Sequence, residues 1–239
     1  MLEIRGLSVS FGGVHALSNI SISIAPGRIY GLIGPNGAGK STTINAITGT
    51  ITPTRGSILW QGEDVSRRPQ HWRARAGLAR TFQNLALFQQ LSVRENVTCG
   101  AIRMHRDEDL VATVDSALDD FGLGDIGDSP VSVLSLGTRK RVEMARAMVA
   151  NPKLLLLDEP AAGLTGGEID DFCTRVRSLK NRGSAVLLVE HDMNLVMSLC
   201  EHLYVLDFGK LIADGTPEEV RESPAVQAAY FGAEHDEQH

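Results

Sequence analysis

The chain has 239 residues, 43% of them hydrophobic and 22% charged, and its formal net charge is −6. This length allows one large domain, or a domain with a subdomain, around a sizeable core. The acidic balance, without a long block of lysine and arginine, argues against a nucleic acid as the main partner. No run approaches the 18 apolar residues of a membrane span, and residues 1–5 contain no apolar leader, so neither a span nor a signal peptide is expected.

Strands and a helix are predicted for the first 60 residues. The strands are predicted where apolar residues alternate or run together, at residues 2–9, 19–24, 29–33 and 57–60. The helix predicted over residues 40–48 ends at Gly49, because glycine commonly follows the last helical residue.

The region of about residues 86–150 has helical periodicity interrupted by glycines, and we expect a helical insertion there. Beyond it, strands alternate with helices, at residues 154–157, 168–180, 185–189, 193–199 and 203–206. This alternation predicts an α/β fold with a mostly parallel sheet and helices on both faces. Thr216 as N-cap and Pro217 as first residue predict a further helix, and the last six residues are expected to fray.

Cysteine usage indicates a reducing compartment. Cys99, Cys173 and Cys200 are far apart in the sequence, odd in number and without a CxxC pair. Neither a disulfide framework nor a zinc site is expected, and reduced cytosolic thiols are predicted.

A glycine-rich segment directly after the 29–33 strand fits the phosphate-binding pattern G-x-x-x-x-G-K-[ST]. Glycine lets the backbone approach an anion closely, so N–H groups of this loop and of the following helix can surround phosphates. Lys40 is predicted to reach the β- and γ-phosphates, and Ser41 to offer a hydroxyl oxygen to Mg²⁺. The ligand is therefore predicted to be a nucleoside triphosphate. The predicted binding residues of this segment are Gly34, Pro35, Asn36, Gly37, Ala38, Gly39, Lys40, Ser41 and Thr42.

Two acids, Asp158 and Glu159, end the apolar strand at residues 154–157. Ligands of open α/β sheets bind at the carboxyl ends of strands, which places this pair beside the glycine-rich loop. Asp158 is predicted to hold Mg²⁺ through a water molecule. Glu159 is predicted to polarise the water that attacks the γ-phosphate.

Residues 134–138, Leu-Ser-Leu-Gly-Thr, precede a strongly helical run and predict a second anion site at a helix N-terminus. With this segment, the sequence resembles the ATP-binding cassette (ABC) family over essentially its whole length. The family's order of motifs is kept, namely the glycine-rich loop, Gln83, the 134–138 signature segment, the Asp158-Glu159 pair and His191. The resemblance implies ATP and Mg²⁺ as ligands and ATP hydrolysis as the reaction.

The resemblance also implies the fold. We expect a P-loop NTPase domain of the ABC type, with a mostly parallel sheet, an antiparallel β subdomain and an inserted helical subdomain. A single domain over residues 1–239 is expected, with its core at about 1–85 and 151–239 and its helical subdomain at about 86–150.

Single residues receive roles from the same resemblance. Phe11 stands where the family stacks an aromatic ring on adenine, although an ordinary edge-strand aromatic is the alternative. Gln83 is expected to touch Mg²⁺ or the attacking water. His191 is expected to hydrogen-bond the γ-phosphate and to hold Glu159 and the water in place. The predicted catalytic residues are therefore Glu159, His191 and Lys40, and the predicted metal ligands are Ser41, Gln83 and Asp158.

The signature segment is expected to act in trans. Ser135 and Gly137 would bind the γ-phosphate of an ATP molecule that another protomer holds. Two cassettes, identical or different, would then sandwich two ATP molecules head to tail, and hydrolysis would let the dimer open.

Residues 77–97, 158–164, 190–197 and the ending Tyr230-Phe231-Gly232 resemble the ATPases of branched-chain amino acid importers. The expected function is an ATP-hydrolysing subunit that drives import of branched-chain or related amino acids. The expected partners are transmembrane permease subunits, a second ABC ATPase subunit and, indirectly, a substrate-binding protein. The expected location is the cytoplasm, peripheral on the inner face of the cell membrane.

Leu85, Leu87 and Phe88 follow Gln83, where the family docks a helix of the permease. They are expected either to form that groove or to belong to the core of the helical subdomain.

Departures from the family pattern keep other functions open. Leu136 and Thr138 replace the usual glycine and glutamine of the signature, and Thr165 stands where aspartate or asparagine is usual. The helical insertion is shorter than in importer ATPases, which leaves a lipopolysaccharide-extracting ATPase as an alternative. A soluble ABC scaffold of iron–sulfur cluster assembly is another. A chromosome or DNA-repair ATPase needs a long coiled coil, and a ribosome-acting one usually has two cassettes with basic linkers; neither pattern is present.

Overall fold

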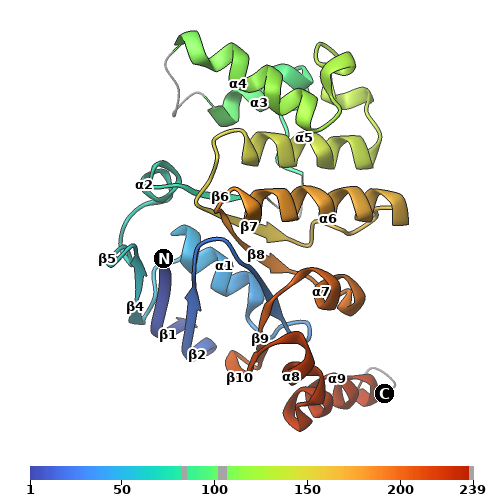
Figure 1. Ribbon diagram of the computed structural model, residues 1–239. Helices are drawn as coiled ribbons and strands as arrows, with labels where there is room; N and C mark the ends of the chain where they lie inside the picture. Colours follow the sequence, from blue (N-terminus) through green and yellow to red (C-terminus); the bar gives the residue numbers. More distant parts are fainter. Residues whose placement is uncertain (82–84, 102–106, 237–239) are drawn as a thin grey trace.

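The computed structural model describes residues 1–81, 85–101 and 107–236. The protein consists of a small antiparallel sheet, a larger and mostly parallel sheet, and helices that cover them (Figure 1). This arrangement confirms the predicted fold class. The division of the chain at residues 86 and 150 stays a prediction.

The small sheet has the strand order β2-β1-β4-β5 and is antiparallel throughout. Its strands are β1 (Leu2–Phe11), β2 (Val14–Ile24), β4 (Arg55–Trp60) and β5 (Glu63–Asp64). Leu2 pairs with Ile24 on one side and with Trp60 on the other, and all three are buried. β1 and β2 are longer than predicted, because Gly12 and Gly13, both at positive φ, join them as a two-residue hairpin turn.

The large sheet has the strand order β10-β9-β3-β8-β7-β6, and only β10 is antiparallel to its neighbour. Its strands are β3 (Ile29–Ile33), β6 (Leu78–Arg80), β7 (Leu154–Asp158), β8 (Ala185–Val189), β9 (His202–Asp207) and β10 (Lys210–Gly215). Parallel strands covered on both faces are continuous apolar runs, and every residue of β3, β7 and β8 is buried. Because β3, β8 and β7 are neighbouring parallel strands, their carboxyl ends lie side by side at one edge of the sheet.

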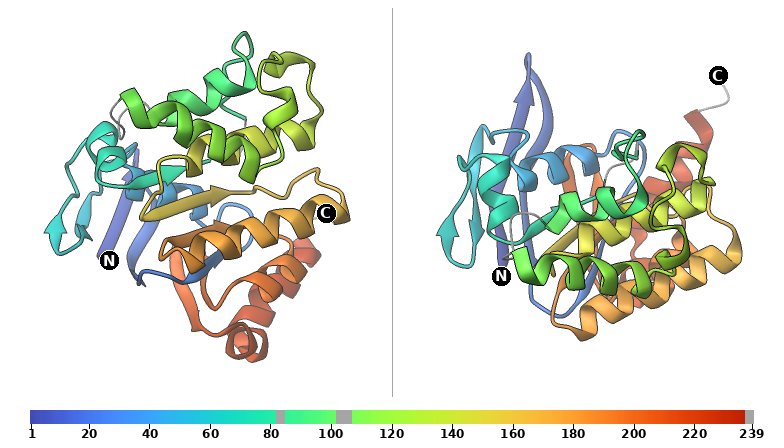
Figure 2. Two further views of the ribbon diagram at one scale, coloured as in Figure 1. Left: turned by 45° about the horizontal axis from the view of Figure 1, so that its top comes forward. Right: turned by 90° about the horizontal axis from the view of Figure 1, so that it is seen from above.

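Helices lie on both faces of the large sheet and at its ends. They are α1 (Lys40–Thr48), α2 (Gln70–Arg75), α3 (Val93–Ala101), α4 (Asp107–Asp120), α5 (Leu136–Met148), α6 (Gly166–Asn181), α7 (Met193–Leu199), α8 (Pro217–Glu222) and α9 (Pro224–Asp236), with 3₁₀ turns at Gly124–Ile126 and Val131–Val133. α3, α4 and α5 gather at one end of the molecule, while α7, α8 and α9 lie at the other (Figures 1 and 2). Within the described ranges, we find no helix that is long and apolar enough to cross a membrane.

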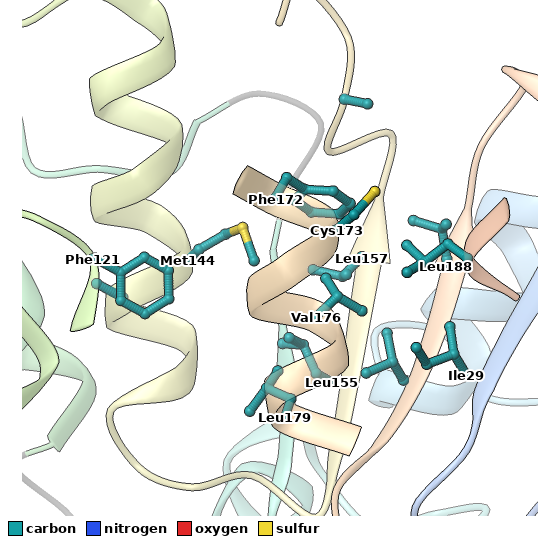
Figure 3. Close-up of a cluster of buried hydrophobic side chains, with 14 of the residues drawn as sticks. Ile29, Phe121, Met144, Leu155, Leu157, Phe172, Cys173, Val176, Leu179 and Leu188 are labelled. Carbon is teal, nitrogen blue, oxygen red and sulfur yellow. The ribbon is translucent and has the colours of Figure 1, made fainter. Parts of the chain in front are cut away.

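Neighbouring residues of β7 face two different cores. Leu155 and Leu157 belong to a cluster with α6, which lies between α5 and the sheet, as Phe172 and Val176 show in Figure 3. Leu154 and Leu156 belong to a second cluster, formed with the small sheet and α1. The strand that carries the two predicted acids is therefore fixed from both sides.

The predicted ends of α1 and α8 agree with the structure, whereas α5 begins earlier than predicted. α1 spans the predicted residues and ends at Gly49, which has a φ of 82°. α8 begins at Pro217 after Thr216, as predicted. α5 begins three residues before the predicted start, because Ser135 is its N-cap and the signature segment itself forms the first turn.

Candidate functional site

The glycine-rich loop joins the buried strand β3 to α1 in the conformation that a phosphate site needs. Gly34, Gly37 and Gly39 have φ values of 148°, 78° and 106°, in the region that favours glycine. Gly34 also lies so close to the sheet that a Cβ atom there would be 2.1 Å from the carbonyl oxygen of Leu206. The loop leaves the N-terminal N–H groups of α1 available for an anion, with Ser41 exposed in the first helical turn.

The side chain of Lys40 folds back over this loop. Its Nζ donates to the carbonyl oxygens of Gly34 and Pro35, at 2.6 and 2.9 Å. Burial lowers the pKa of Lys40, and the charges of Glu159 and Asp158 oppose that shift. The ammonium group therefore lies on the loop and feels the charges of both acids, while its contact with phosphates stays a prediction.

Asp158 ends β7 and is 5% exposed. Its Oδ2 accepts a hydrogen bond from Nη2 of Arg80 at 2.9 Å. Nη1 of the same arginine donates to Oδ1 of Asn45 in α1, at 2.7 Å. Neither Arg80 nor Asn45 was singled out from the sequence. Their contact depends on the pairing of β6 with β7 in the sheet, which no local pattern indicates.

Glu159 follows the strand in a left-handed backbone conformation, with a φ of 48°. Such a conformation costs a residue other than glycine about 1–3 kcal/mol and is concentrated at functional sites. Its N–H donates to the carbonyl oxygen of Val189, the last residue of β8, at 2.9 Å. The chain therefore turns sharply at the edge where β7 and β8 end.

His191 lies at the same edge, two residues after β8. Its side chain is 68% exposed and lies 3.7 Å from the carboxylate of Glu190, measured from Nδ1 to Oε2. Glu190 is buried, and its two oxygens accept from the N–H groups of Ala161 and His191, at 2.8 and 3.2 Å. Glu190 was not singled out from the sequence, although an acid directly after an apolar strand was visible.

The signature segment forms the start of α5. The Ser135 hydroxyl accepts from the N–H of Thr138 at 3.3 Å and also lies 3.0 Å from its hydroxyl oxygen. Gly137 is packed against Glu168 of α6, since a Cβ atom there would be 1.8 Å from Oε1 of that side chain. Leu136 is about half exposed. The segment thus presents a helix N-terminus that can attract an anion, with the leucine side chain of Leu136 exposed beside it.

Comparison with known proteins places the chain in a family. A family model described as ABC transporter matches residues 17–162, and one described as branched-chain amino acid ATP-binding cassette transporter matches residues 210–236. The high-affinity branched-chain amino acid transport ATP-binding protein BraF of Pseudomonas aeruginosa is 37% identical over 97% of this chain and 98% of its own. The chain belongs to the ABC transporter ATP-binding family. Its activity is therefore ATP hydrolysis that powers a transporter.

Two further proteins are similar to this ABC ATPase over nearly its whole length. The lipopolysaccharide export system ATP-binding protein LptB of Haemophilus influenzae is 36% identical over 97% of each chain. The ADP conformation of an ATP-binding cassette of an ABC transporter superposes with a TM-score of 0.87, at 31% identity, over 97% of this chain and 98% of that one.

Other predicted residues of this ABC ATPase have mixed outcomes. Phe11 is half exposed at the end of β1, and its role stays a prediction. Gln83 lies outside the described residues. Leu87 is buried in the core cluster, which fits the core alternative for that residue, while Phe88 is 55% exposed and its role in a permease groove stays a prediction.

One further residue of the signature helix reaches the edge of the sheet. Nζ of Lys140 donates to the carbonyl oxygen of Pro160 at 2.8 Å and also to that of Ala162. Burial lowers the pKa of Lys140, and the nearby carboxylates of Glu190 and Glu143 oppose the shift. The loop of residues 160–165, which follows Glu159, is therefore held by α5 on one side and by Glu190 on the other.

Proposed function

We propose that the chain powers the import of branched-chain or related amino acids at the inner face of the cell membrane. Two permease subunits and a second ABC ATPase would complete the transporter, and a substrate-binding protein would deliver the cargo. The match of residues 210–236 carries this proposal. The nucleotide motifs are shared by the whole ABC family, whereas this C-terminal region, formed by β10, α8 and α9, matches the importer branch.

In the proposed reaction the glycine-rich loop holds the phosphates of ATP. The N–H groups at the start of α1 would bind the phosphate oxygens, and Lys40 would exchange its two loop carbonyls for the β- and γ-phosphates. Glu159 would polarise the attacking water. The exposed ring of Phe11 would stack on adenine, and His191 would hold the γ-phosphate and the water.

The residues at this edge fit a magnesium ion. Mg²⁺ prefers oxygen ligands and usually keeps several waters beside one or two protein groups and the phosphates. Ser41 offers a hydroxyl and Asp158 a carboxylate, while no cluster of three His, Cys, Asp or Glu side chains suited to a metal occurs in the described ranges. We assign Ser41, Asp158 and Gln83 to Mg²⁺, which would neutralise phosphate charge when bound.

The second half of each ATP site is assigned to a partner protomer. Ser135 and Gly137 would bind the γ-phosphate of the partner's ATP through the N-terminus of α5. A dimer of two ATPases would then close around two nucleotides and open after hydrolysis. Leu85 and Phe88, rather than the buried Leu87, would contact the permease.

Lipopolysaccharide export is the second candidate function. The identity to LptB, 36%, is close to the 37% shared with BraF, and both similarities cover nearly the whole chain. Cargo therefore has to be tested directly.

The test is uptake of radiolabelled leucine by cells that lack this chain. We expect uptake to fall and to return with the wild-type chain but not with Glu159→Gln, which keeps the shape of the side chain and removes its charge. Unchanged leucine uptake with less lipopolysaccharide at the cell surface would support the second candidate. No change in either would reject both cargo assignments.

A further inference from the structure

Arg80 connects the two elements that carry two of the expected magnesium ligands, Ser41 of α1 and Asp158 of β7. It is the last residue of β6, and its guanidinium group bridges Asp158 at the end of β7 and Asn45 in α1, at 2.9 and 2.7 Å. Its side chain is 14% exposed and that of Asp158 is 6% exposed. This is an ion pair at the edge of the site and not a surface contact.

The geometry of arginine suits this task. A guanidinium group is planar and donates from nitrogens at fixed positions, so two acceptors on different elements fix its orientation. Here one acceptor belongs to the helix that begins with Lys40 and Ser41, and the other is the carboxylate of Asp158. This pair uses only Oδ2 of Asp158, so that Oδ1 could accept a hydrogen bond from a water molecule bound to the metal.

We propose that Arg80 is a positioning residue that holds the carboxylate of Asp158 toward Mg²⁺ and fixes its place relative to the α1 helix that carries Ser41. This inference rests on the proposed function, because it presupposes that Asp158 and Ser41 serve the metal. In this proposal Arg80 acts through Asp158 and Asn45, and no contact with ATP or the metal is assigned to it.

Charge and position make opposite predictions for the loss of this arginine. A cation beside Asp158 weakens the attraction of that carboxylate for Mg²⁺, so charge alone predicts tighter metal binding without it. Partners that orient metal ligands, however, are worth about 10–100-fold in metal affinity or activity. We expect this positioning effect to exceed the effect of charge, and therefore expect weaker Mg²⁺ binding without the arginine.

The experiment compares Arg80→Met, Arg80→Lys and Asn45→Ala in the full-length chain, with Arg73→Met as the matched control. Arg73 is also buried and also donates to α1, at the carbonyl oxygens of Ala46 and Ile47. Among the described residues it forms no ion pair, although the charge of Asp64 acts on it. Binding of a fluorescent ATP analogue is titrated in EDTA and at increasing Mg²⁺. The Mg²⁺ dependence of ATP hydrolysis and thermal unfolding are measured on the same samples.

We expect Arg80→Met to raise the half-saturating Mg²⁺ concentration about tenfold in both assays, to leave nucleotide binding in EDTA unchanged, and to be partly rescued in Arg80→Lys. Asn45→Ala, which keeps the ion pair, should give a smaller shift in the same direction. Arg73→Met should lower the unfolding temperature and leave the Mg²⁺ midpoint alone.

An unchanged or lower Mg²⁺ midpoint in a folded Arg80→Met variant would overturn the proposal, and so would a rise of the same size in Arg73→Met. The proposed function fails separately, if the wild-type chain shows no Mg²⁺-dependent nucleotide binding at all.

Discussion

Replacing Lys140 with methionine is expected to release the loop that follows Glu159. The change removes two hydrogen bonds from an ammonium group to the carbonyl oxygens of Pro160 and Ala162. A hydrogen bond with a charged partner contributes about 1.5–3 kcal/mol. Because the bond to Ala162 lies at the surface, we expect a total loss of about 2 kcal/mol in the free energy of unfolding. For a chain of this length, that lowers the unfolding temperature by roughly 4–8 °C.

The larger effect of this variant is expected on catalysis. Glu159 is joined directly to the released loop, and a displacement of a catalytic group by about 1 Å can cost on the order of a hundredfold in rate. Lys140 does not touch the glycine-rich loop. We therefore expect kcat of ATP hydrolysis to fall about tenfold or more while KM for ATP stays within about twofold.

Steady-state ATP hydrolysis and thermal unfolding of the purified chain test this prediction. Arg139→Met is the control, since Arg139 is the preceding residue of α5 and donates instead to the carbonyl oxygen of Ser132, at 2.7 Å. A Lys140→Met variant that loses stability but keeps its kcat would refute the link between this lysine and Glu159.

Three further outcomes are expected. Glu159→Gln should stop hydrolysis and accumulate an ATP-bound dimer in size-exclusion chromatography, because the water is no longer polarised. Ser135→Arg should abolish turnover while each chain still binds ATP, because this residue is assigned to the partner's nucleotide. A thiol reagent such as Ellman's reagent at pH 8 should label one cysteine of the native chain and three after unfolding. Cys99 is exposed, whereas burial raises the pKa of Cys173 and raises that of Cys200 to about 12.

Each of these outcomes can fail in a distinct way. Wild-type hydrolysis by Glu159→Gln would remove the catalytic assignment, and full turnover by Ser135→Arg would remove the shared site. Native labelling that persists in Cys99→Ser would show that one of the two other thiols is accessible.

Local motifs explain which parts of the structure the sequence could predict. The predicted bounds of β3 and α1 are correct because the glycine-rich pattern marks the end of the strand and the start of the helix, and Gly49 follows the last helical residue. The bounds of β8 and α7 are correct because Asp192 caps the helix directly after an apolar strand. The contacts of Arg80, by contrast, span 35 and 78 residues of sequence. They depend on which strands are neighbours in the sheet, and no local pattern contains that information.

The same reasoning explains Lys140 and Leu87. In the sequence, Lys140 is one of several charged residues in the helix that follows the signature segment, and nothing distinguishes it from a lysine exposed to solvent. Only the structure shows that its ammonium group contacts the 160–165 loop. Leu87 and Phe88 are adjacent apolar residues, and only the packing of the helices decides that the first is buried and the second exposed.

Glu190 has a mechanical consequence for how this ATPase changes state. One rigid carboxylate accepts from the backbone on both sides of the catalytic edge, at Ala161 and at His191. If one segment moves alone, the buried carboxylate of Glu190 loses one of its two backbone hydrogen bonds, which is costly for a buried charge. The loop after Glu159 and the segment of His191 are therefore coupled, so that a rearrangement of one is transmitted to the other through the carboxylate between them.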